Sequence, residues 1–446
     1  MTITATFDMI NTAGVAQDQV DLLRGVAAEA VRRWSAVLAG DAALTVRIQI
    51  TTDVTSQRAE GSWSNGTTAA RTGGFSYAVG SPAWQLQGNA RAGTASDADI
   101  VISVHPDYLQ NELFLDPTPA TRGDTPSDRT DGLSVLIHEI GHAIGFTGYY
   151  DEGTDTFSGN YKTGYDYRLS VVNGAVMFDG PNVRALMGGA IPLTDNNYCH
   201  YGNSNAYPGT DSDPLLGLMN GVVYYRGYAY AIGALDLAVL ADTGVGTVRN
   251  DILNVPYLPS MRGGAGNDTI TGGGGANLLQ GDAGNDVIVG NGGSDVLKGG
   301  SGNDRLYGGA SNDTLAGGSG TDRLAGGKGI DLLTGGPGAD RFVFDTAPAS
   351  GNRDTITDFS HAEGDSILLS LASMPGLHAT GALAADAFYA APGATAAHDA
   401  GDRVVYDSNS GVLYYDADGS GGAAAVALAL LNGHPSLVAG DFLIVA

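Results

Sequence analysis

Nine consecutive units of nine residues, running from Gly263 to Val343, decide the fold of the C-terminal half of this chain. The first reads Gly-Gly-Ala-Gly-Asn-Asp-Thr-Ile-Thr (263–271), and the last reads Gly-Gly-Pro-Gly-Ala-Asp-Arg-Phe-Val (335–343). No insertion interrupts the register between them. A period this regular excludes a disordered linker and predicts a stack of glycine-rich turns, each followed by a very short strand.

The sixth position of the unit supplies the predicted calcium ligands. Glycines allow backbone angles that expose carbonyl oxygens, and a carboxylate adds the hard oxygen ligand that Ca²⁺ prefers. Asn277 replaces the acid in the second unit and Ser311 replaces a glycine in the sixth, so we expect weaker sites at those turns. The acid is present in eight units, at Asp268, Asp286, Asp295, Asp304, Asp313, Asp322, Asp331 and Asp340.

Outside the repeats, a second stretch points to a different metal. His138-Glu139-Ile140-Gly141-His142 is an HExxH pattern, and residues four apart share one face of a helix. The two imidazoles are therefore predicted zinc ligands, with Glu139 as general base. Thr130 and Asp131 are candidate N-caps of this helix, and Gly145 offers a C-terminal stop.

The N-terminal half around this stretch predicts a mixed α and β structure. Strand patterns cover Ile3–Phe7, Leu44–Ile50 and Ala98–Val104, and an amphipathic helix covers Asp18–Leu38. An apolar helix from about Ala234 to Thr243 is expected to close the region. The domain boundaries predicted from these patterns are 1–245 for the metal-binding α+β domain, 246–262 for a linker, 263–343 for the repeats and 344–446 for a C-terminal β region.

Composition restricts the partners. The net charge is −26, with 48 acidic against 22 basic residues, which disfavours nucleic-acid binding because phosphate neutralisation needs clustered Lys and Arg. The single cysteine excludes an internal disulfide framework. No apolar run reaches the length of a membrane span, and the first residues carry no classical secretory signal.

Together these patterns resemble a metzincin zinc protease joined to the calcium-binding C-terminal region of serralysins. The C-terminal resemblance spans roughly 263–446 and includes Asp354–Phe359 (Asp-Thr-Ile-Thr-Asp-Phe) and the apolar, acidic end of the chain. Asp416–Gly421 (Asp-Ala-Asp-Gly-Ser-Gly) resembles a further calcium loop. The resemblance implies a parallel β-roll followed by a β-sandwich, and export through type I secretion machinery by an uncleaved C-terminal signal.

The catalytic half departs from serralysins. The extended metzincin pattern needs a histidine where Gly148 stands, and a tyrosine follows the Met-turn methionine where Gly221 stands. The spacing is instead similar to leishmanolysin-type metzincins, in which an insertion precedes the third histidine. That resemblance implies that Met219 is the Met-turn methionine beneath the metal.

A catalytic zinc normally has three protein ligands and one open position. His200 is the predicted third ligand, because the other histidines follow the linker or, like His105, precede the helix. Asp151 and Cys199 are the rival ligands. Tyr224 and Tyr225 are candidates to assist in stabilising the oxyanion.

The resulting prediction is a secreted zinc endopeptidase that hydrolyses protein or peptide substrates. The zinc would lower the pKa of its bound water and polarise the scissile carbonyl, while Glu139 transfers the proton to the leaving amine. The calcium repeats would fold after export. The alternatives are a calcium-dependent extracellular adhesin with an inactive metal site, and a structural coat protein. The intact Glu139 disfavours both.

Overall fold

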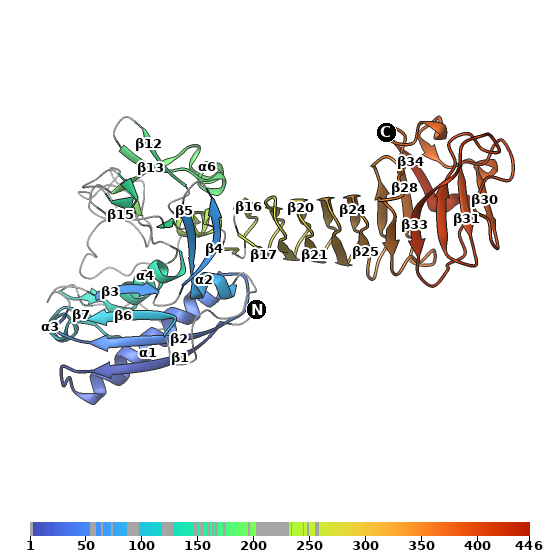
Figure 1. Ribbon diagram of the computed structural model, residues 1–446. Helices are drawn as coiled ribbons and strands as arrows, with labels where there is room; N and C mark the ends of the chain where they lie inside the picture. The colour runs from blue at the N-terminus through green and yellow to red at the C-terminus, as the bar shows by residue number, and fades with distance from the viewer. Residues whose placement is uncertain are drawn as a thin grey trace. The chain divides into compact units, whose positions relative to one another are not determined.

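The chain forms two compact units, Met1–Tyr257 and Leu258–Ala446 (Figure 1). None of the helices in the described ranges is both long and apolar enough to cross a membrane. The computed structural model describes residues 3–53, 59–63, 66–72, 75–86, 98–117, 126, 128–145, 150–151, 156–157, 161–162, 165, 168–172, 175–194, 197–201, 232, 234–243, 245–247, 249–254 and 258–446.

A four-stranded sheet with the order β1-β2-β6-β3 underlies the first unit. Strands β1 (Ile3–Asn11), β2 (Ala42–Ile50) and β6 (Ile100–Val104) run parallel, and β3 (Ala59–Trp63) pairs antiparallel with β6. The three parallel strands confirm the predicted strand segments. In β2 the alternate residues from Ala42 to Ile50 are buried, so this strand places one face against the core.

Helix α1 (Gln17–Ser35) buries the side of the helix that the sequence pattern predicted, which includes Val20, Leu23 and Trp34. It packs against helix α4 (Gly132–Ile144). The indole Nε1–H of Trp34 donates a hydrogen bond of 2.8 Å to the carbonyl of Ile137. This bond fixes α4 close to the middle of its length, next to the HExxH residues.

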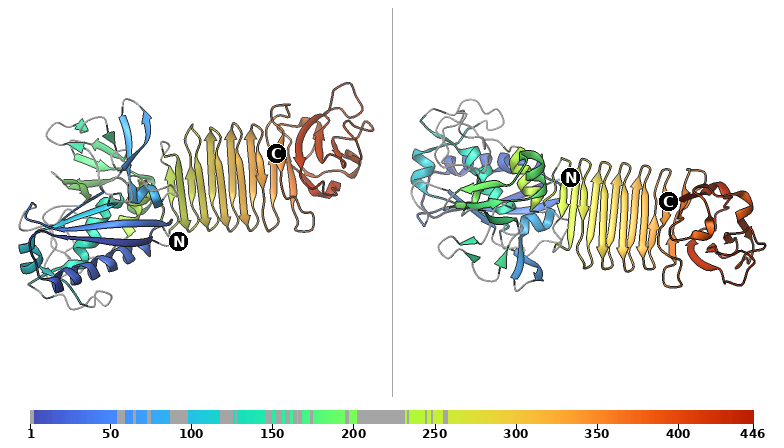
Figure 2. Two further views of the ribbon diagram at one scale, coloured as in Figure 1. Left: turned by 60° about the horizontal axis from the view of Figure 1, so that its bottom comes forward. Right: turned by 90° about the horizontal axis from the view of Figure 1, so that it is seen from above.

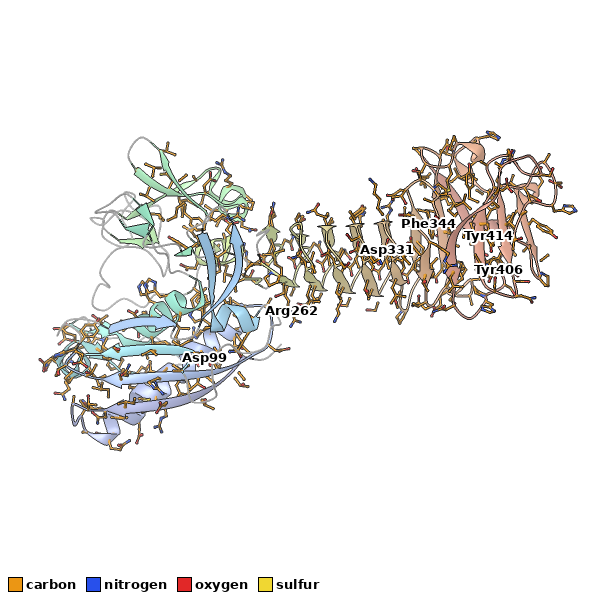
Figure 3. The ribbon with its side chains drawn as sticks, viewed as in Figure 1. Asp99, Arg262, Asp331, Phe344, Tyr406 and Tyr414 are labelled. Carbon is orange, nitrogen blue, oxygen red and sulfur yellow. The ribbon has the colours of Figure 1, made fainter. Side chains whose placement is uncertain are left out.

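Asp99 joins three elements at the start of β6 (Figure 3). Its carboxylate is fully buried and accepts hydrogen bonds from the backbone N–H of Thr45 (2.7 Å) and from Nε2 of Gln85 (3.2 Å). Gln85 lies in α2 (Ser81–Leu86). A buried carboxylate needs such partners, and here they hold α2 against β2 and β6.

Small sheets and short helices complete the first unit. Asp242, at the end of α7, accepts the backbone N–H groups of Asn182 and Val183 and so holds α6 against α7. The remaining elements are β4 (Gly66–Thr72), β5 (Phe75–Gly80), α3 (Pro106–Asn111), β7 (Leu113–Phe114), β8 (Thr130–Asp131), β9 (Tyr150–Asp151), β10 (Thr156–Phe157), β11 (Tyr161–Lys162), β12 (Leu169–Val172), β13 (Ala175–Phe178), α6 (Pro181–Met187), β14 (Ile191–Thr194), β15 (Asn197–Tyr201), α7 (Ala234–Asp242) and β16 (Ile252–Asn254).

The second unit begins as a parallel β-roll. Successive repeat units place their strands alternately in two parallel sheets, so units two apart are neighbours in one sheet (Figure 2). The strands of the roll are β17 (Ser260–Ala265), β18 (Thr269–Thr271), β19 (Leu278–Ala283), β20 (Val287–Gly292), β21 (Val296–Ser301), β22 (Arg305–Ala310), β23 (Thr314–Ser319), β24 (Arg323–Lys328), β25 (Leu332–Thr334) and β26 (Arg341–Phe344).

One apolar side chain per unit fills the space between the two sheets. The eighth residue of each unit, such as Leu306, Leu315 and Leu324, is fully buried. A core that is a single residue deep per strand buries little apolar surface. The roll therefore depends on what its turns bind.

The two sheets of the roll continue into the C-terminal region. β28 and β34 extend the sheet that contains β26, and β27 and β33 extend the sheet that contains β25. The bounds of these last elements are β27 (Asp354–Ile356), β28 (Ser366–Ser370), η1 (Pro375–Leu377), β29 (Gly381–Ala382), η2 (Ala385–Ala387), β30 (Phe388–Ala391), β31 (Val404–Asp407), β32 (Val412–Tyr415), β33 (Val426–Leu431), η3 (Ala439–Asp441) and β34 (Phe442–Val445).

Candidate metal sites

Helix α4 presents the HExxH residues. Asp131 is its N-cap, and its side chain accepts the backbone N–H of Ser134 at 2.9 Å. The helix ends before Gly145, where a side chain would collide with Leu240 of α7. The predicted start and stop of this helix are thus confirmed, and the helix that was expected to close the unit packs against its end.

The side chains of His138 and His142 converge. Their Nε2 atoms are 3.1 Å apart, and their rings meet edge to face with centroids separated by 4.7 Å. Two imidazole nitrogens bound tetrahedrally to one zinc, each at about 2.0–2.1 Å, lie about 3.3 Å apart. The observed separation therefore suits two ligands of a common ion as well as a direct N–H···N hydrogen bond.

Glu139 lies between these histidines in the sequence and, like His138, is 8 % exposed. It affects a residue that the sequence did not single out. The pKa of the Tyr108 phenol, in α3, is raised to about 12 by burial and then by the negative charge of Glu139. Tyr108 is therefore a neutral neighbour of the carboxylate. No pattern marked it, because only the fold brings α3 to α4.

Several predicted residues lie where the structure gives no side-chain description. His200 and Cys199 fall in β15 and Asp151 in β9, with only their backbones described. Gly148, Met219, Gly221, Tyr224 and Tyr225 lie outside the described residues. The third zinc ligand, the Met-turn and the oxyanion contact remain predictions.

The eight predicted calcium aspartates form two ladders along the roll. In the ladder of odd-numbered units, Oδ1 of Asp304 accepts the backbone N–H of Asp286 at 2.8 Å, and Oδ1 of Asp322 accepts that of Asp304 at 2.8 Å. In the other ladder, Oδ1 of Asp313 accepts the N–H of Asp295 at 2.8 Å. From the third unit onward, each carboxylate thus joins its own turn to the turn two units before it.

The second oxygen of every one of these carboxylates lacks a partner. Oδ2 is buried and unbonded in Asp268, Asp286, Asp295, Asp304, Asp313, Asp322, Asp331 and Asp340. A buried oxygen without a donor is costly. Glycine at the first position of the unit leaves space beside it: a Cβ on Gly299 would lie 2.3 Å from Oδ2 of Asp304 and 2.4 Å from the carbonyl oxygen of Gly317.

These oxygens can hold Ca²⁺, which takes carboxylate and carbonyl ligands. Without a cation the carboxylates resist ionisation. Burial is the main cause that raises the pKa of Asp295 to about 6 and of Asp304, Asp313 and Asp340 to about 7. A bound divalent cation would remove this penalty. The turns thus have the chemistry of calcium sites.

Asn277 stands at the start of one ladder and Asp365 at the end of the other. Asn277, which replaces the acid, accepts the N–H of Gly273 at 2.9 Å and donates Nδ2–H to the carbonyl of Leu258 at 3.1 Å. Asp365, beyond the repeats, accepts the N–H groups of Asp340 and Ser360 at 2.9 and 2.7 Å. These side chains satisfy both polar atoms without an ion, which is why the ladder can stop there.

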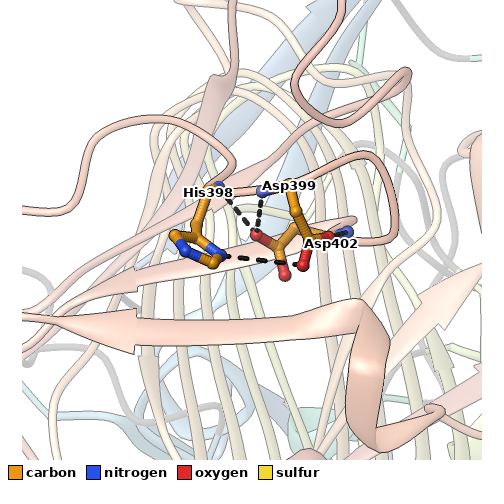
Figure 4. A group of neighbouring side chains, drawn as sticks. All are labelled: His398, Asp399 and Asp402. Carbon is orange, nitrogen blue, oxygen red and sulfur yellow. Dashed lines mark hydrogen bonds and ion pairs between the residues drawn. The ribbon is translucent and has the colours of Figure 1, made fainter.

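The C-terminal region contains another group of possible metal ligands, His398, Asp399 and Asp402 (Figure 4). Asp402 is buried, but its carboxylate accepts the N–H groups of His398 and Asp399 at 2.7 and 3.0 Å. The other two side chains are mostly exposed, and Nδ1 of His398 lies 3.6 Å from Asp399. Asp418, in the loop that resembles a calcium site, accepts the N–H of Ala423 at 3.1 Å. These hydrogen bonds from backbone N–H groups to Asp402 and Asp418 hold surface loops in place.

A comparison with known protein families supports the identification of the repeats as calcium-binding. Residues 260–288, 289–324 and 316–346 match the model of the RTX calcium-binding nonapeptide repeat. None of the curated proteins matches the chain. This part of the chain is therefore a set of RTX calcium-binding repeats, and Ca²⁺ is the metal that it binds. Such repeats are typical of proteins that are secreted by the type I route.

Proposed function

We propose that this chain is a secreted zinc-dependent endopeptidase whose RTX repeats fold on calcium after export. The observation that carries the proposal is the convergence of His138 and His142, with Nε2 atoms 3.1 Å apart, on a helix that also bears the buried Glu139. An inert helix has no need for two imidazoles and a carboxylate in this arrangement.

The elements around α4 suit a peptide substrate. β3 packs beside α4 and ends the four-stranded sheet as the structure describes it. An edge strand offers backbone N–H and C=O groups with which an extended peptide can pair. A peptide added along β3 would lie next to the HExxH helix.

The proposed chemistry divides roles among these residues. His138 and His142, together with a third ligand for which His200 is proposed, would hold Zn²⁺. When bound, zinc supplies Lewis-acid polarisation of the scissile carbonyl and acidifies water. Glu139 accepts the proton from the attacking water and returns it to the departing amine. Tyr108, kept neutral by its environment, can donate a hydrogen bond near that carboxylate.

Cleavage of casein in Zn²⁺ and Ca²⁺ tests the proposal, with Glu139→Gln as the key variant. General-base catalysis contributes about 10²- to 10⁴-fold, so we expect a loss of that size with zinc content unchanged. Glu112→Gln is the matched control, since its carboxylate also raises the pKa of Tyr108 but has no catalytic role in the proposal. Equal activity of wild type and Glu139→Gln would exclude the protease.

Replacing each candidate third ligand separates the alternatives for the zinc site. His200→Ala should remove zinc and activity, while Asp151→Ala and Cys199→Ala should retain both. Full zinc and activity in His200→Ala alone would show that the assignment is wrong. A wild-type protein that binds zinc but cleaves nothing would favour the adhesin.

A further inference from the structure

Three arginines stand in register on one outer face of the roll. Arg305, Arg323 and Arg341 occupy adjacent parallel strands β22, β24 and β26, paired Arg305 with Arg323 and Arg323 with Arg341. Each precedes a buried core residue, so each faces outward. Because neighbouring strands lie about 4.8 Å apart, the three residues form a row of about 10 Å along the roll. We call these three residues the arginine row.

The arginine row has no acidic partner within residues 258–446, all of which the structure describes. Arg305 and Arg341 form no side-chain hydrogen bond or ion pair, and Arg323 only donates to the hydroxyl of Tyr307 at 3.3 Å and lies over its ring. By contrast, Arg262 in β17, labelled in Figure 3, belongs to a bidentate pair. Its guanidinium donates to Asp282 at 2.6 and 3.0 Å. The roll can pair an arginine, but it leaves the row unpaired.

Folding gives no reason for this arrangement. Like charges directly opposite each other in a sheet are destabilising. The same position in the other sheet carries uncharged residues: Leu278, Val296, Thr314 and Leu332. The row does not serve to neutralise the calcium aspartates either, because both sheets follow a ladder of aspartates and only one sheet has arginines at this position of the unit.

We propose that the arginine row binds an acidic polysaccharide that lies along the roll. The guanidinium fork suits a carboxylate, and the length of one sugar ring is close to the spacing between strands. A linear polyuronate carries its carboxylates along one axis, as the row carries its arginines along the roll. Ala325 and Val343 lie two residues further along β24 and β26 on the same face, in a buried apolar cluster with Leu368 against which Tyr307 and Val445 pack, so an apolar surface flanks the row on one side.

Other anionic partners match the row less well. An extended peptide places side chains on one face about every 6.7 Å, which is out of step with the strands. A membrane surface calls for charge spread over an area, whereas the row is one residue wide. Nucleic-acid binding depends on the neutralisation of many phosphates, whereas the row supplies three arginines, which can contact a short stretch of an acidic glycan.

Binding of a fluorescent oligogalacturonate to the full chain in fixed Ca²⁺ tests the proposal. The triple variant Arg305→Gln, Arg323→Gln, Arg341→Gln should bind at least about tenfold more weakly. The matched control Lys298→Gln, Lys328→Gln, Arg353→Gln changes the net charge equally at exposed positions outside the row, and it should stay within about twofold of wild type. Circular dichroism in Ca²⁺ verifies that both variants fold.

Three results would overturn the proposal. They are equal weakening in both triple variants, no binding of oligogalacturonate by wild type, and tighter binding of poly-glutamate than of oligogalacturonate. If the triple variant does not fold, Arg323→Lys provides the second measurement, since it keeps the charge but loses the fork. We expect intermediate affinity for Arg323→Lys, and unchanged affinity would contradict the proposed contact. Neither measurement depends on protease activity.

Discussion

The calcium sites of the roll and the zinc site that we propose in the first unit are specified by the sequence in opposite ways. In the roll, one short pattern is copied, and Asp304 or Asp313 meets its neighbours simply because identical turns stack eighteen residues apart. In the first unit, His138 and His142 are set by one helix, but every other partner must come from distant segments. A repeated site can be predicted from the local sequence, whereas a site that occurs once depends on contacts made by the whole fold.

The sites also differ in the chemistry that stabilises them. The carboxylates of the roll are buried with one oxygen unsatisfied, so the cation is part of the fold. The histidines of α4 lie on a helix that Asp131 caps and Trp34 supports without any metal. We therefore expect calcium to control folding of the roll, and zinc to control only chemistry in the first unit.

Calcium removal is the largest expected effect. Eight buried carboxylates repel one another and each has one oxygen, Oδ2, without a hydrogen-bond donor, and the thin core offsets little of that cost. At neutral pH, EGTA should largely unfold residues 263–343, and millimolar Ca²⁺ should restore β-structure. Far-ultraviolet circular dichroism measures the change. Identical strand content with chelator and with Ca²⁺ would contradict the expectation that calcium controls folding of the roll.

Acid should partly replace calcium. The folded pKa values of Asp295, about 6, and of Asp304, Asp313 and Asp340, about 7, lie above the ordinary 3.8. The folded roll then holds protons more tightly than the unfolded chain. Without Ca²⁺ its stability should be greatest below about pH 4 and fall as the pH rises through 6 to 7. If the calcium-free roll instead became more stable as the pH rose through 6 to 7, the assignment of these carboxyl groups as buried would be wrong.

Single substitutions in the ladder should change the calcium count. Asp304→Asn keeps an oxygen for the N–H of Asp286 but replaces the unsatisfied Oδ2 with an amide, so we expect fewer bound ions. Asn277→Asp removes the hydrogen bond to the Leu258 carbonyl and leaves two oxygens facing each other, so we expect a gain. Calcium titration of the two variants measures both changes. If both variants bound as many calcium ions as wild type, the ions would not be bound at these two turns.

The smallest expected effect is that of Trp34→Phe. The variant loses the Nε1–H bond to Ile137, which should cost the first unit about 1 kcal/mol of unfolding free energy. Denaturant unfolding followed in Ca²⁺ would measure it, and the transition of the roll serves as an internal control. A shift of the roll transition of the same size would show that the two units are not independent.

The sequence was sufficient wherever one pattern determined both an element and its surroundings. The register of the repeats, the limits of α4 and the strands β1, β2 and β6 all follow from local periodicity and capping residues. The arginine row was also present in the sequence, at the seventh position of alternate units. Recognising it required knowing that units two apart share a sheet.

Contacts made between distant segments could not be read in this way. Nothing in the sequence around Tyr108 indicated that α3 would bring its phenol close to Glu139. The closing contacts of Asp365 were equally hidden, because the segment after Val343 abandons the nine-residue period while it continues the same sheet. Irregular chain segments carry no internal signal of what they will touch.

Metal analysis of the full chain tests the separation of the two sites most directly. Zinc and calcium would be measured in the same sample for wild type, for His138→Ala with His142→Ala, and for Asp304→Asn. The account predicts that the histidine variant loses zinc and keeps its calcium, and that Asp304→Asn loses calcium and keeps its zinc. Wild type without zinc, or loss of both metals in either variant, would contradict it.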